Sequence, residues 1–348
     1  MIDLSTDGSY VVVGGYKTSL PSAASVELAG STVPRVIGTV NSGGQYVLSA
    51  STTPPTGTAG STFRGVVSDG LGNFWGGGQN SGIYYFGNNA PAVRITPAGL
   101  GAIRNLIMVN GRPCFSTSQF PVSGSFGIAA FTSVAPTTPE EPVLIINSGN
   151  AVTGGSGTAN PKGFCIKPDF TIAYLVDLRP LATGAGTTGG GIYRYNGDGS
   201  GLAGSWTFAY TITNNLLANG GAFQEVVADF SGATPIIYAT AGAGATVALG
   251  AGTSLVTAAD TGAATTTFTQ LAAAPITAPF RGLTFAPKPV SLSIARSGAD
   301  VVISWNGGGT LRSASVVTGP FLPVAGSLTS PYTTSVSGAA QYYTVGFP

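Results

Sequence analysis

Short apolar runs alternate with polar turns along almost the whole chain. Stretches rich in Val, Ile, Tyr, Phe and Thr are separated by clusters of Gly, Asn, Asp and Ser. This alternation predicts short antiparallel β-strands joined by tight turns. Apolar residues at the three-and-four spacing of a helix are not sustained, because Gly or Pro interrupts nearly every long window. The sequence therefore predicts an all-β fold.

The predicted strands recur in groups of four, which indicates a repeated structural unit. The clearest group starts with FRGVVSDG at Phe63 and continues through NFWGGGQ, GIYYFG and AVRITPAG. Four further groups have the same order of strands and start at Ile2, Ile103, Gly163 and Phe223. Radially arranged four-stranded sheets, the blades of a β-propeller, repeat in this way, and the first strand of each sheet lines the axis.

A sixth group starts but does not continue. The segment FRGLTFAP, from Phe280 to Pro287, closely resembles the first strand of the group at Phe63, but no three strands follow it. We therefore predict about six blades, five of them complete and one represented only by its inner strand. Propellers commonly close by combining strands from both ends of the chain, which removes exposed sheet edges. In this sequence the partners of the last inner strand are missing.

The pattern changes from about Val290, where several short predicted strands surround a single Trp, Trp305. This is typical of a small Ig-like or fibronectin-like sandwich, whose core is marginal at that size. We predict two domains, a β-propeller over residues 1–288 and a β-sandwich over residues 289–348.

Composition narrows the classes of function. Charged residues make up only 8% of the chain and the net charge is +1, where an ordinary soluble domain has about 25% charged residues. No basic patch is present, which argues against nucleic-acid binding, and no apolar run is long enough to span a membrane. Met1–Asp3 shows no signal-peptide pattern, so we expect that a signal was removed or that the start is artificial. The scarcity of Lys and Glu beside abundant Ser, Thr, Ala and Gly favours an extracellular or cell-surface protein.

Several motifs together resemble a group of exported bacterial β-propeller proteins, mostly of unassigned function. They are STDGSYVVVGGY from Ser5, the two FRG strands, GGGIYRYNGDG from Gly189 and SLVTAADTG from Ser254. The end of the chain, with VVISWNG and PYTTSVSGAAQYYTV, is similar to a sandwich found at the ends of exported proteins in the same bacteria. The resemblance implies the fold and export, but no activity. It also implies an N-terminal segment that supplies three strands of the closing blade, and this sequence starts just after the place where that segment would end.

The chain contains no His, which excludes Ser-His-Asp and Cys-His nucleophile pairs and the usual zinc and haem sites. The two cysteines, Cys114 and Cys165, are compatible with one disulfide or with two buried free thiols. The adjacent carboxylates Glu140 and Glu141 lie in the segment APTTPEEP, which we interpret as a solvated loop rather than as a glycosidase pair.

The remaining polar motifs have structural interpretations. We expect four carboxylates after inner strands to cap turns rather than to act as acids or bases: Asp7, Asp169, Asp177 and Asp229. Asn196–Ser200 alternates like a calcium loop but lacks the distal Glu, so we expect a hairpin turn. The three Gly-Gly-Gly runs precede no predicted helix and do not indicate a phosphate cradle.

Two groups of side chains have both a structural and a functional interpretation. Arg64 and Arg281 occupy matching places at the start of two inner strands, where they either surround the axial channel or, as we favour, hydrogen-bond to carbonyls of neighbouring blades. A set of aromatic residues could offer faces for sugar stacking, but we expect it to pack between blades: Tyr84, Tyr85, Tyr193, Tyr195 and Trp206.

These observations predict a protein without catalytic, cofactor-binding or metal-binding residues. We expect an extracellular structural protein that self-assembles, as a fibre or surface-layer subunit, when strands of another copy complete the unfinished blade. One alternative is a secreted adhesin or carbohydrate-binding propeller with a surface glycan as its partner. The other is a lyase or hydrolase that relies on Asp, Arg and Tyr.

Overall fold

The structure is a computed structural model, and the part of the chain that it describes forms β-strands and no helix. The described residues are 2–19, 33–52, 62–79, 81–87, 91–120, 126–149, 159–179, 190–213, 221–243, 253–264, 266–275, 280–306, 309–326, 329–336 and 340–346. The prediction of an all-β protein is confirmed.

Five antiparallel sheets of four strands each follow one another along the chain. The first contains β1 (Ile2–Leu4), β2 (Tyr10–Tyr16), β3 (Arg35–Asn41) and β4 (Tyr46–Thr52). The second contains β5 (Phe63–Ser68), β6 (Phe74–Gly78), β7 (Gly82–Tyr85) and β8 (Val93–Arg94). The third contains β9 (Gly101–Val109), β10 (Arg112–Gln119), β11 (Gly127–Ala130) and β12 (Val143–Asn147). The fourth contains β13 (Pro161–Ile166), β14 (Ile172–Asp177), β15 (Gly191–Gly197) and β16 (Trp206–Ile212), and the fifth contains β17 (Gly221–Asp229), β18 (Ile236–Ala243), β19 (Thr253–Ala259) and β20 (Thr269–Ala274).

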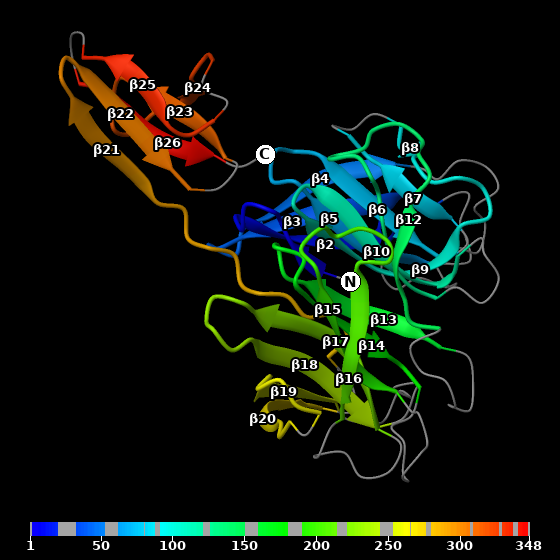
Figure 1. Cartoon of the computed structure of the whole chain (residues 1–348). Coiled ribbons are helices and arrows are strands. Elements are labelled where there is room, and N and C mark those ends of the chain that lie inside the picture. The colour runs from blue at the N-terminus through cyan, green and yellow to red at the C-terminus, as the bar shows by residue number, and fades with distance from the viewer. Residues whose placement is uncertain are drawn as a thin grey trace.

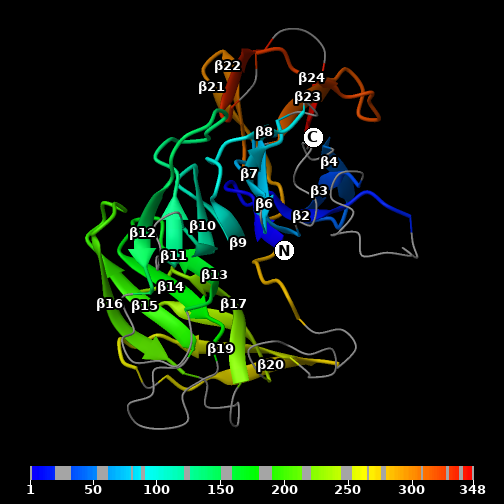
Figure 2. The same cartoon turned by 90° about the vertical axis from the view of Figure 1, so that its right-hand side faces the viewer.

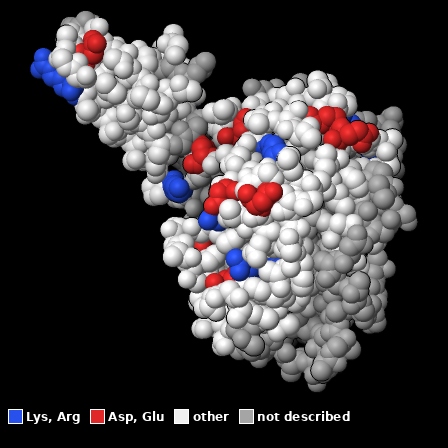
Figure 3. All heavy atoms as spheres, in the orientation of Figure 1, with Lys and Arg blue, Asp and Glu red and all other residues white. Residues whose placement is uncertain are grey.

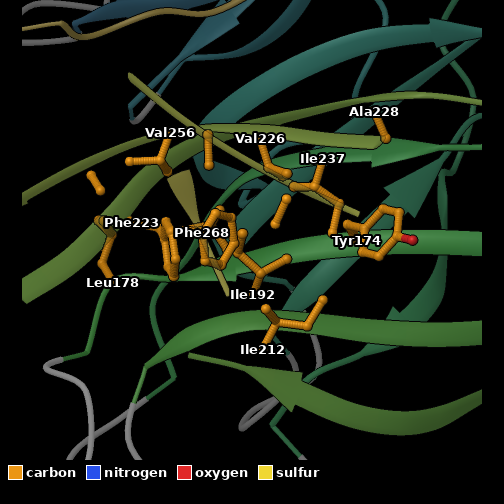
Figure 4. Close-up of a cluster of buried hydrophobic side chains, with 14 residues drawn as sticks. Tyr174, Leu178, Ile192, Ile212, Phe223, Val226, Ala228, Ile237, Val256 and Phe268 are labelled. Carbon is orange, nitrogen blue, oxygen red and sulfur yellow. The ribbon is translucent and has the colours of Figure 1, made fainter. Parts of the chain in front are cut away.

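The five sheets stand side by side around an axis, with the first strand of each sheet innermost (Figures 1 and 2). Each consecutive pair of sheets encloses a cluster of buried apolar side chains. Figure 4 shows the cluster between the fourth and fifth sheets, where Tyr174, Ile192 and Ile212 meet Phe223 and Ile237. The five complete blades of the predicted propeller are therefore confirmed, and burial of these interfaces is the main source of their stability.

The fifth sheet and the first sheet are separated by the segment Phe280–Pro287, which we call the axial segment. The backbone N–H of Phe280 donates to Oγ1 of Thr253 in β19, and the ring of Phe285 packs edge-on against Tyr238 of β18 at 5.9 Å. Gly282 lies beside Ile2 of β1. The segment thus lies where the inner strand of a sixth blade was predicted, and we call this place the sixth position. Among the described residues it is not a β-strand and forms no ladder with another strand.

The last six strands form two three-stranded sheets that pack as a small sandwich. They are β21 (Leu292–Ser297), β22 (Asp300–Trp305) and β25 (Tyr332–Ser335) in one sheet, and β24 (Leu322–Pro323), β23 (Thr310–Ala314) and β26 (Tyr342–Gly346) in the other. Ile303, Trp305 and Leu311 form its buried apolar cluster, and the indole N–H of Trp305 donates to the carbonyl of Gly309 at 3.0 Å. The C-terminal sandwich is confirmed, while the domain boundary at residue 288 stays a prediction.

The sandwich lies next to the first sheet. A pocket of about 300 Å³ is lined by residues of the β3–β4 hairpin on one side and of β23 and β26 on the other: Asn41, Gln45, Val47, Arg312, Val345 and Gly346. The backbone N–H of Lys288 donates to the carbonyl of Gly8 at 2.8 Å, so the link between axial segment and sandwich is held against the first turn of the propeller.

Candidate functional site

The inner strands carry a feature that the sequence pattern did not show, a β-bulge near the start of each of four strands. In β5, Phe63 and Gly65 pair with consecutive residues of β6, so Arg64 is the extra residue. In β9 the extra residue is Arg104, and in β17 it is Gln224. A bulge leaves the extra residue out of the ladder and redirects its side chain.

The fourth bulge is in β13, where Lys162 and Gly163 together stand opposite Val176. The axial segment repeats the same residues as β5, since Phe280-Arg281-Gly282 matches Phe63-Arg64-Gly65. We define the bulge ring as five polar side chains around the axis: Arg64, Arg104, Lys162, Gln224 and Arg281. Four of the five are cationic.

One hydrogen bond and the electrostatics of Lys162 place the ring members near one another. The ammonium of Lys162 donates to Oε1 of Gln224 at 2.6 Å, which joins β13 to β17. The pKa of Lys162 is lowered first by burial, and Glu225 opposes that shift. Three further positive charges lower the pKa again: those of Arg281, Arg104 and Arg64. The ring is therefore a concentration of like charge.

Two carboxylates lie beside the ring. Glu225 of β17 is 3% exposed and accepts a hydrogen bond from Nδ2 of Asn105 at 2.9 Å. Burial raises the pKa of Glu225 to about 7, and the nearby Lys162 opposes this shift. The pKa of Asp3 in β1 is also raised, first by burial, although backbone hydrogen bonds lower it and Glu225 raises it further.

Small residues allow the inner strands to approach one another at this level. A Cβ on Gly65 would lie 2.9 Å from the backbone nitrogen of Leu106. One on Gly163 would lie 2.6 Å from the Cα of Glu225. Such contacts are closer than real Cβ atoms tolerate, so glycine at these two positions sets the width of the axis.

Arg64 and Arg281 both lie near enough to Lys162 for their charges to lower its pKa, while the favoured interpretation, hydrogen bonds to carbonyls of neighbouring blades, stays a prediction. Arg64 hydrogen-bonds to the side chain of Gln79 in its own sheet. Sequence reasoning missed Arg104, Lys162 and Gln224. A usable signal was present, because each follows an apolar residue or Pro at the start of an inner strand: IRN, PKG and FQE beside FRG.

Three of the four predicted turn carboxylates cap turns after inner strands. Asp7 accepts from the N–H of Ser9 and Asp229 from that of Ser231. Asp169 accepts from the N–H of Thr171 and pairs with Lys167 at 2.6 Å. Hydrogen bonds from Lys167 and Thr171 lower its pKa to about 2.

Contrary to the prediction, Asp177 does not follow an inner strand. It lies at the end of β14, the second strand of its sheet, and is fully buried. It pairs with Arg179 at 2.9 Å and accepts from the N–H of Arg179 as well. The guanidinium of Arg179 also donates to the hydroxyl of Tyr193. The buried pair thus joins a turn to β15, which is a structural role like that of the other three.

A second buried polar cluster joins the fourth and fifth sheets. Asp260, which follows β19, accepts from the hydroxyls of Tyr174 and Tyr210 and forms an ion pair with Arg194 at 3.2 Å. Arg194 in turn donates to the hydroxyl of Tyr210. Because the members come from both sheets, we call this cluster the Asp260 clamp.

The loop and turn motifs have the expected structural roles. Glu140 accepts from the N–H groups of Thr132 and Ser133. Burial would raise the pKa of Glu140, but the hydrogen bonds from Ser133 and Thr132 outweigh burial and lower it. Asn196–Ser200 lies in the β15–β16 hairpin, where Asp198 accepts from the N–H of Ser200.

The other candidate chemistry is accounted for as follows. Cys114 and Cys165 are free thiols. Gly76–Gly78 belong to β6, while Gly189, Gly307 and Gly308 lie outside the described residues. Within the described ranges no group of three or more Cys, Asp or Glu residues is placed to hold a metal, and no helix there is long and apolar enough to cross the bilayer.

The five aromatic residues pack between sheets or against them. Two of them also line a groove of about 370 Å³ between β12 and β16, together with Asn147, Thr207 and Phe208. In this groove the hydroxyl of Tyr195 and the indole N–H of Trp206 are buried and find no hydrogen-bond partner among the described residues.

The two sheet faces at the sixth position are apolar and only partly covered. In β2, Tyr10 and Val12 are buried against the second sheet, while Val11 and Val13 point the other way and are partly exposed. On the same open face, Leu48 and Tyr46 of β4 are 46% and 60% exposed. The facing side of the fifth sheet presents partly exposed apolar residues as well: Val227, Ile236, Tyr238 and Leu255.

Several solved structures are similar to the chain. No family model matches it, and no curated protein matches it. Among solved structures, it is similar to a protein from Lactobacillus plantarum (TM-score 0.42, 15% identity, 91% of this chain and 81% of that chain). It is also similar to PorZ, a surface component of the type-IX secretion system of Porphyromonas gingivalis (TM-score 0.46, 11% identity, 89% of this chain and 39% of that one). A third is YCF48 bound to a D1 peptide (TM-score 0.40, 12% identity, 88% and 74%). These likenesses bear on neither activity nor partners.

Proposed function

We propose that the protein is a non-enzymatic extracellular structural protein that self-assembles when strands of a second copy fill the sixth position. The observation that carries this proposal is the axial segment, which lies at the place of an inner strand but forms no strand ladder among the described residues, between two partly exposed apolar sheet faces. Exposed apolar patches and unpaired strands are the surfaces to which another chain adds strands.

The low surface charge supports association between copies. Only 8% of the residues are charged, and the face of the molecule in Figure 3 shows a few small clusters of charged groups on a largely uncharged surface. Proteins with little net charge lose the repulsion that keeps copies apart.

The sandwich is our candidate for the donated strands. Its described surface carries several exposed large apolar side chains: Ile294, Val316, Val317, Leu322, Val336 and Tyr342. β21 is an edge strand whose residues are almost all exposed. A contact between the sandwich of one copy and the sixth position of the next uses two different surfaces, so it does not close and produces a filament.

The test is the assembly state of the purified chain, measured by light scattering and electron microscopy. We expect long regular particles from the unaltered protein. Leu48→Glu places a charge on the open face of the first sheet and should shift the population to single chains. Leu202→Glu is the matched control, because Leu202 is 60% exposed but lies in the β15–β16 turn, far along the chain from the open faces. A chain that stays monomeric at high concentration, or assembly that survives Leu48→Glu, would overturn the proposal.

Glycan binding is a second candidate function, supported by the groove between β12 and β16. Aromatic faces with nearby hydrogen-bond donors suit a sugar ring, and the groove offers Trp206 and Phe208 beside the unpaired hydroxyl of Tyr195. We expect a glycan array to report binding that Trp206→Ala removes while the melting temperature changes little. An array without signal above background would argue against this function.

A further inference from the structure

The four cations of the bulge ring outnumber the two carboxylates beside it, Glu225 and Asp3. Among the described residues, Arg104, Lys162 and Arg281 form no ion pair within 4 Å of a carboxylate. The hydrogen bond that Lys162 makes is with the neutral amide of Gln224. Partly buried cations normally pair with anions, because taking a lone charge out of water is costly.

Two donors at the ring are also unused. Gln224 is 4% exposed, and its Nε2 has no hydrogen-bond partner within the described part of the chain. The same holds for Nε of Arg104, which is buried from solvent. Because its Oε1 accepts from Lys162, the side chain of Gln224 lies among the ring members. Unpaired buried donors are rare in folded proteins and require a partner.

The ring is only partly covered. Arg281 is exposed, and Arg64, Arg104 and Lys162 are each half-buried. Glu225 is more deeply buried than these cations and is held by Asn105. A ligand that enters therefore meets cationic and amide donors.

The arrangement of donors indicates the class of ligand. Arginine presents N–H groups in a fork that matches the oxygens of sulfate, phosphate and carboxylate, and lysine adds a point charge. Several converging cations favour a doubly charged anion over a singly charged one, because a single negative charge leaves most of the repulsion in place.

We propose that the bulge ring binds a doubly charged tetrahedral oxyanion, a sulfate or a phosphate monoester group, between the four bulged inner strands and Arg281. The β-bulges serve this site by turning one polar side chain from each of the four strands toward the axis. The site is formed within one chain, so it does not depend on the assembly proposed above.

Equilibrium dialysis of the full chain against radiolabelled inorganic sulfate tests the proposal. We expect one saturable site per chain. Arg104→Gln should weaken binding at least tenfold, and Gln224→Glu, which places a carboxylate beside Lys162, should weaken it further. Arg296→Gln removes the same charge from an exposed position in the sandwich and should leave binding unchanged. Circular dichroism and melting temperature show whether each variant is folded.

Competition identifies the chemistry that the site recognises. Inorganic phosphate should displace the sulfate if the site accepts both groups, and failure to displace it assigns the site to sulfate alone. Acetate at the same concentration should not displace it. The proposal is wrong if dialysis shows no saturable site, if Arg104→Gln and Arg296→Gln bind alike, or if acetate competes as well as phosphate.

Discussion

Strands β14 and β18 are the second strands of neighbouring sheets, but their surroundings differ. In β14 the five residues from Ala173 to Asp177 are all buried, on both faces of the strand. In β18 buried and partly exposed residues alternate at first, with Ile237 and Ala239 covered and Ile236 and Tyr238 partly open. The fourth sheet therefore has a neighbour on each side, whereas the fifth has a full neighbour on one side only.

The comparison shows that the propeller is held together by apolar contacts between neighbouring sheets rather than by closure of the whole circle of sheets. Each consecutive pair from the first sheet to the fifth has an apolar cluster, and within the described residues no such cluster joins the fifth sheet to the first. Burial of apolar surface contributes about 25 cal/mol per Å² to stability. A partner that covers the two open faces would therefore add to the stability of the propeller. The following predictions test this difference, from the largest expected effect to the smallest.

We expect the largest effect from loss of the Asp260 clamp, which joins the fourth and fifth sheets. Asp260→Ala leaves Arg194 without its carboxylate in a largely buried place, and breaking such a pair costs about 3–5 kcal/mol. Chemical denaturation should show this loss in the free energy of unfolding. Asp300→Ala, in the sandwich, is the control and should change it little. Equal effects of the two substitutions would show that the clamp contributes nothing to the interface.

Truncation of a leucine should cost more inside a sheet interface than at the sixth position. Leu175 of β14 is fully buried, and Leu→Ala at such a site costs about 2–5 kcal/mol. Leu255 of β19 is only partly buried, and we expect Leu255→Ala to cost about 1 kcal/mol. Denaturation of dilute protein should give this order. If assembly covers the open faces, Leu255→Ala should also lower the extent of assembly, while the reverse order of stabilities would contradict the comparison.

Adding a methyl group should cost more stability in an inner strand than in the axial segment. Gly163→Ala forces a Cβ against the backbone of Glu225, and overpacking of this kind costs about 1–3 kcal/mol. In Gly282→Ala the nearest atom is Cγ1 of Ile2 at 3.1 Å, a side-chain atom that can move. Thermal unfolding should therefore show a lower melting temperature for Gly163→Ala and almost no change for Gly282→Ala. A similar drop for both would mean that the axial segment is packed as tightly as the inner strands.

Glu225, beside the axis, should make the free energy of unfolding depend on pH near neutrality. Because burial raises the pKa of Glu225 to about 7, the folded protein binds more protons than the unfolded chain between the ordinary glutamate pKa of about 4.3 and pH 7. Stability is then fully present below that window and falls as the pH rises through 7, by about 3–4 kcal/mol. Melting temperatures should be higher at pH 5 than at pH 8, by a few degrees. Glu225→Gln should flatten the dependence, and Glu141→Gln, in the exposed loop, should not.

Much of the fold could be predicted because strand, turn and repeat signals agreed. The groups of four were visible from the turns that follow their first strands, such as Ser68-Asp69-Gly70 and Asn110-Gly111. The sandwich was visible from its short alternating runs around Trp305.

The bulge ring could be predicted only in part. Arg64 and Arg281 were noticed because their tripeptides are identical. Arg104, Lys162 and Gln224 were missed because a bulge shifts the two-residue period by one, so a simple alternation assigns the wrong face to the extra residue. The buried pair of Asp177 and Arg179 was missed for another reason, since burial of a turn depends on sheets that are distant in sequence.

The path of the axial segment has a mechanical consequence. The chain reaches the sandwich only through Phe280–Lys288, which is bonded to the fifth sheet at Thr253 and to the first sheet at Gly8. Tension applied to the sandwich therefore enters the propeller at its centre and acts on the first and fifth sheets. The three sheets between them, with their complete apolar interfaces, are loaded last, so a stretched chain should yield first at the sixth position.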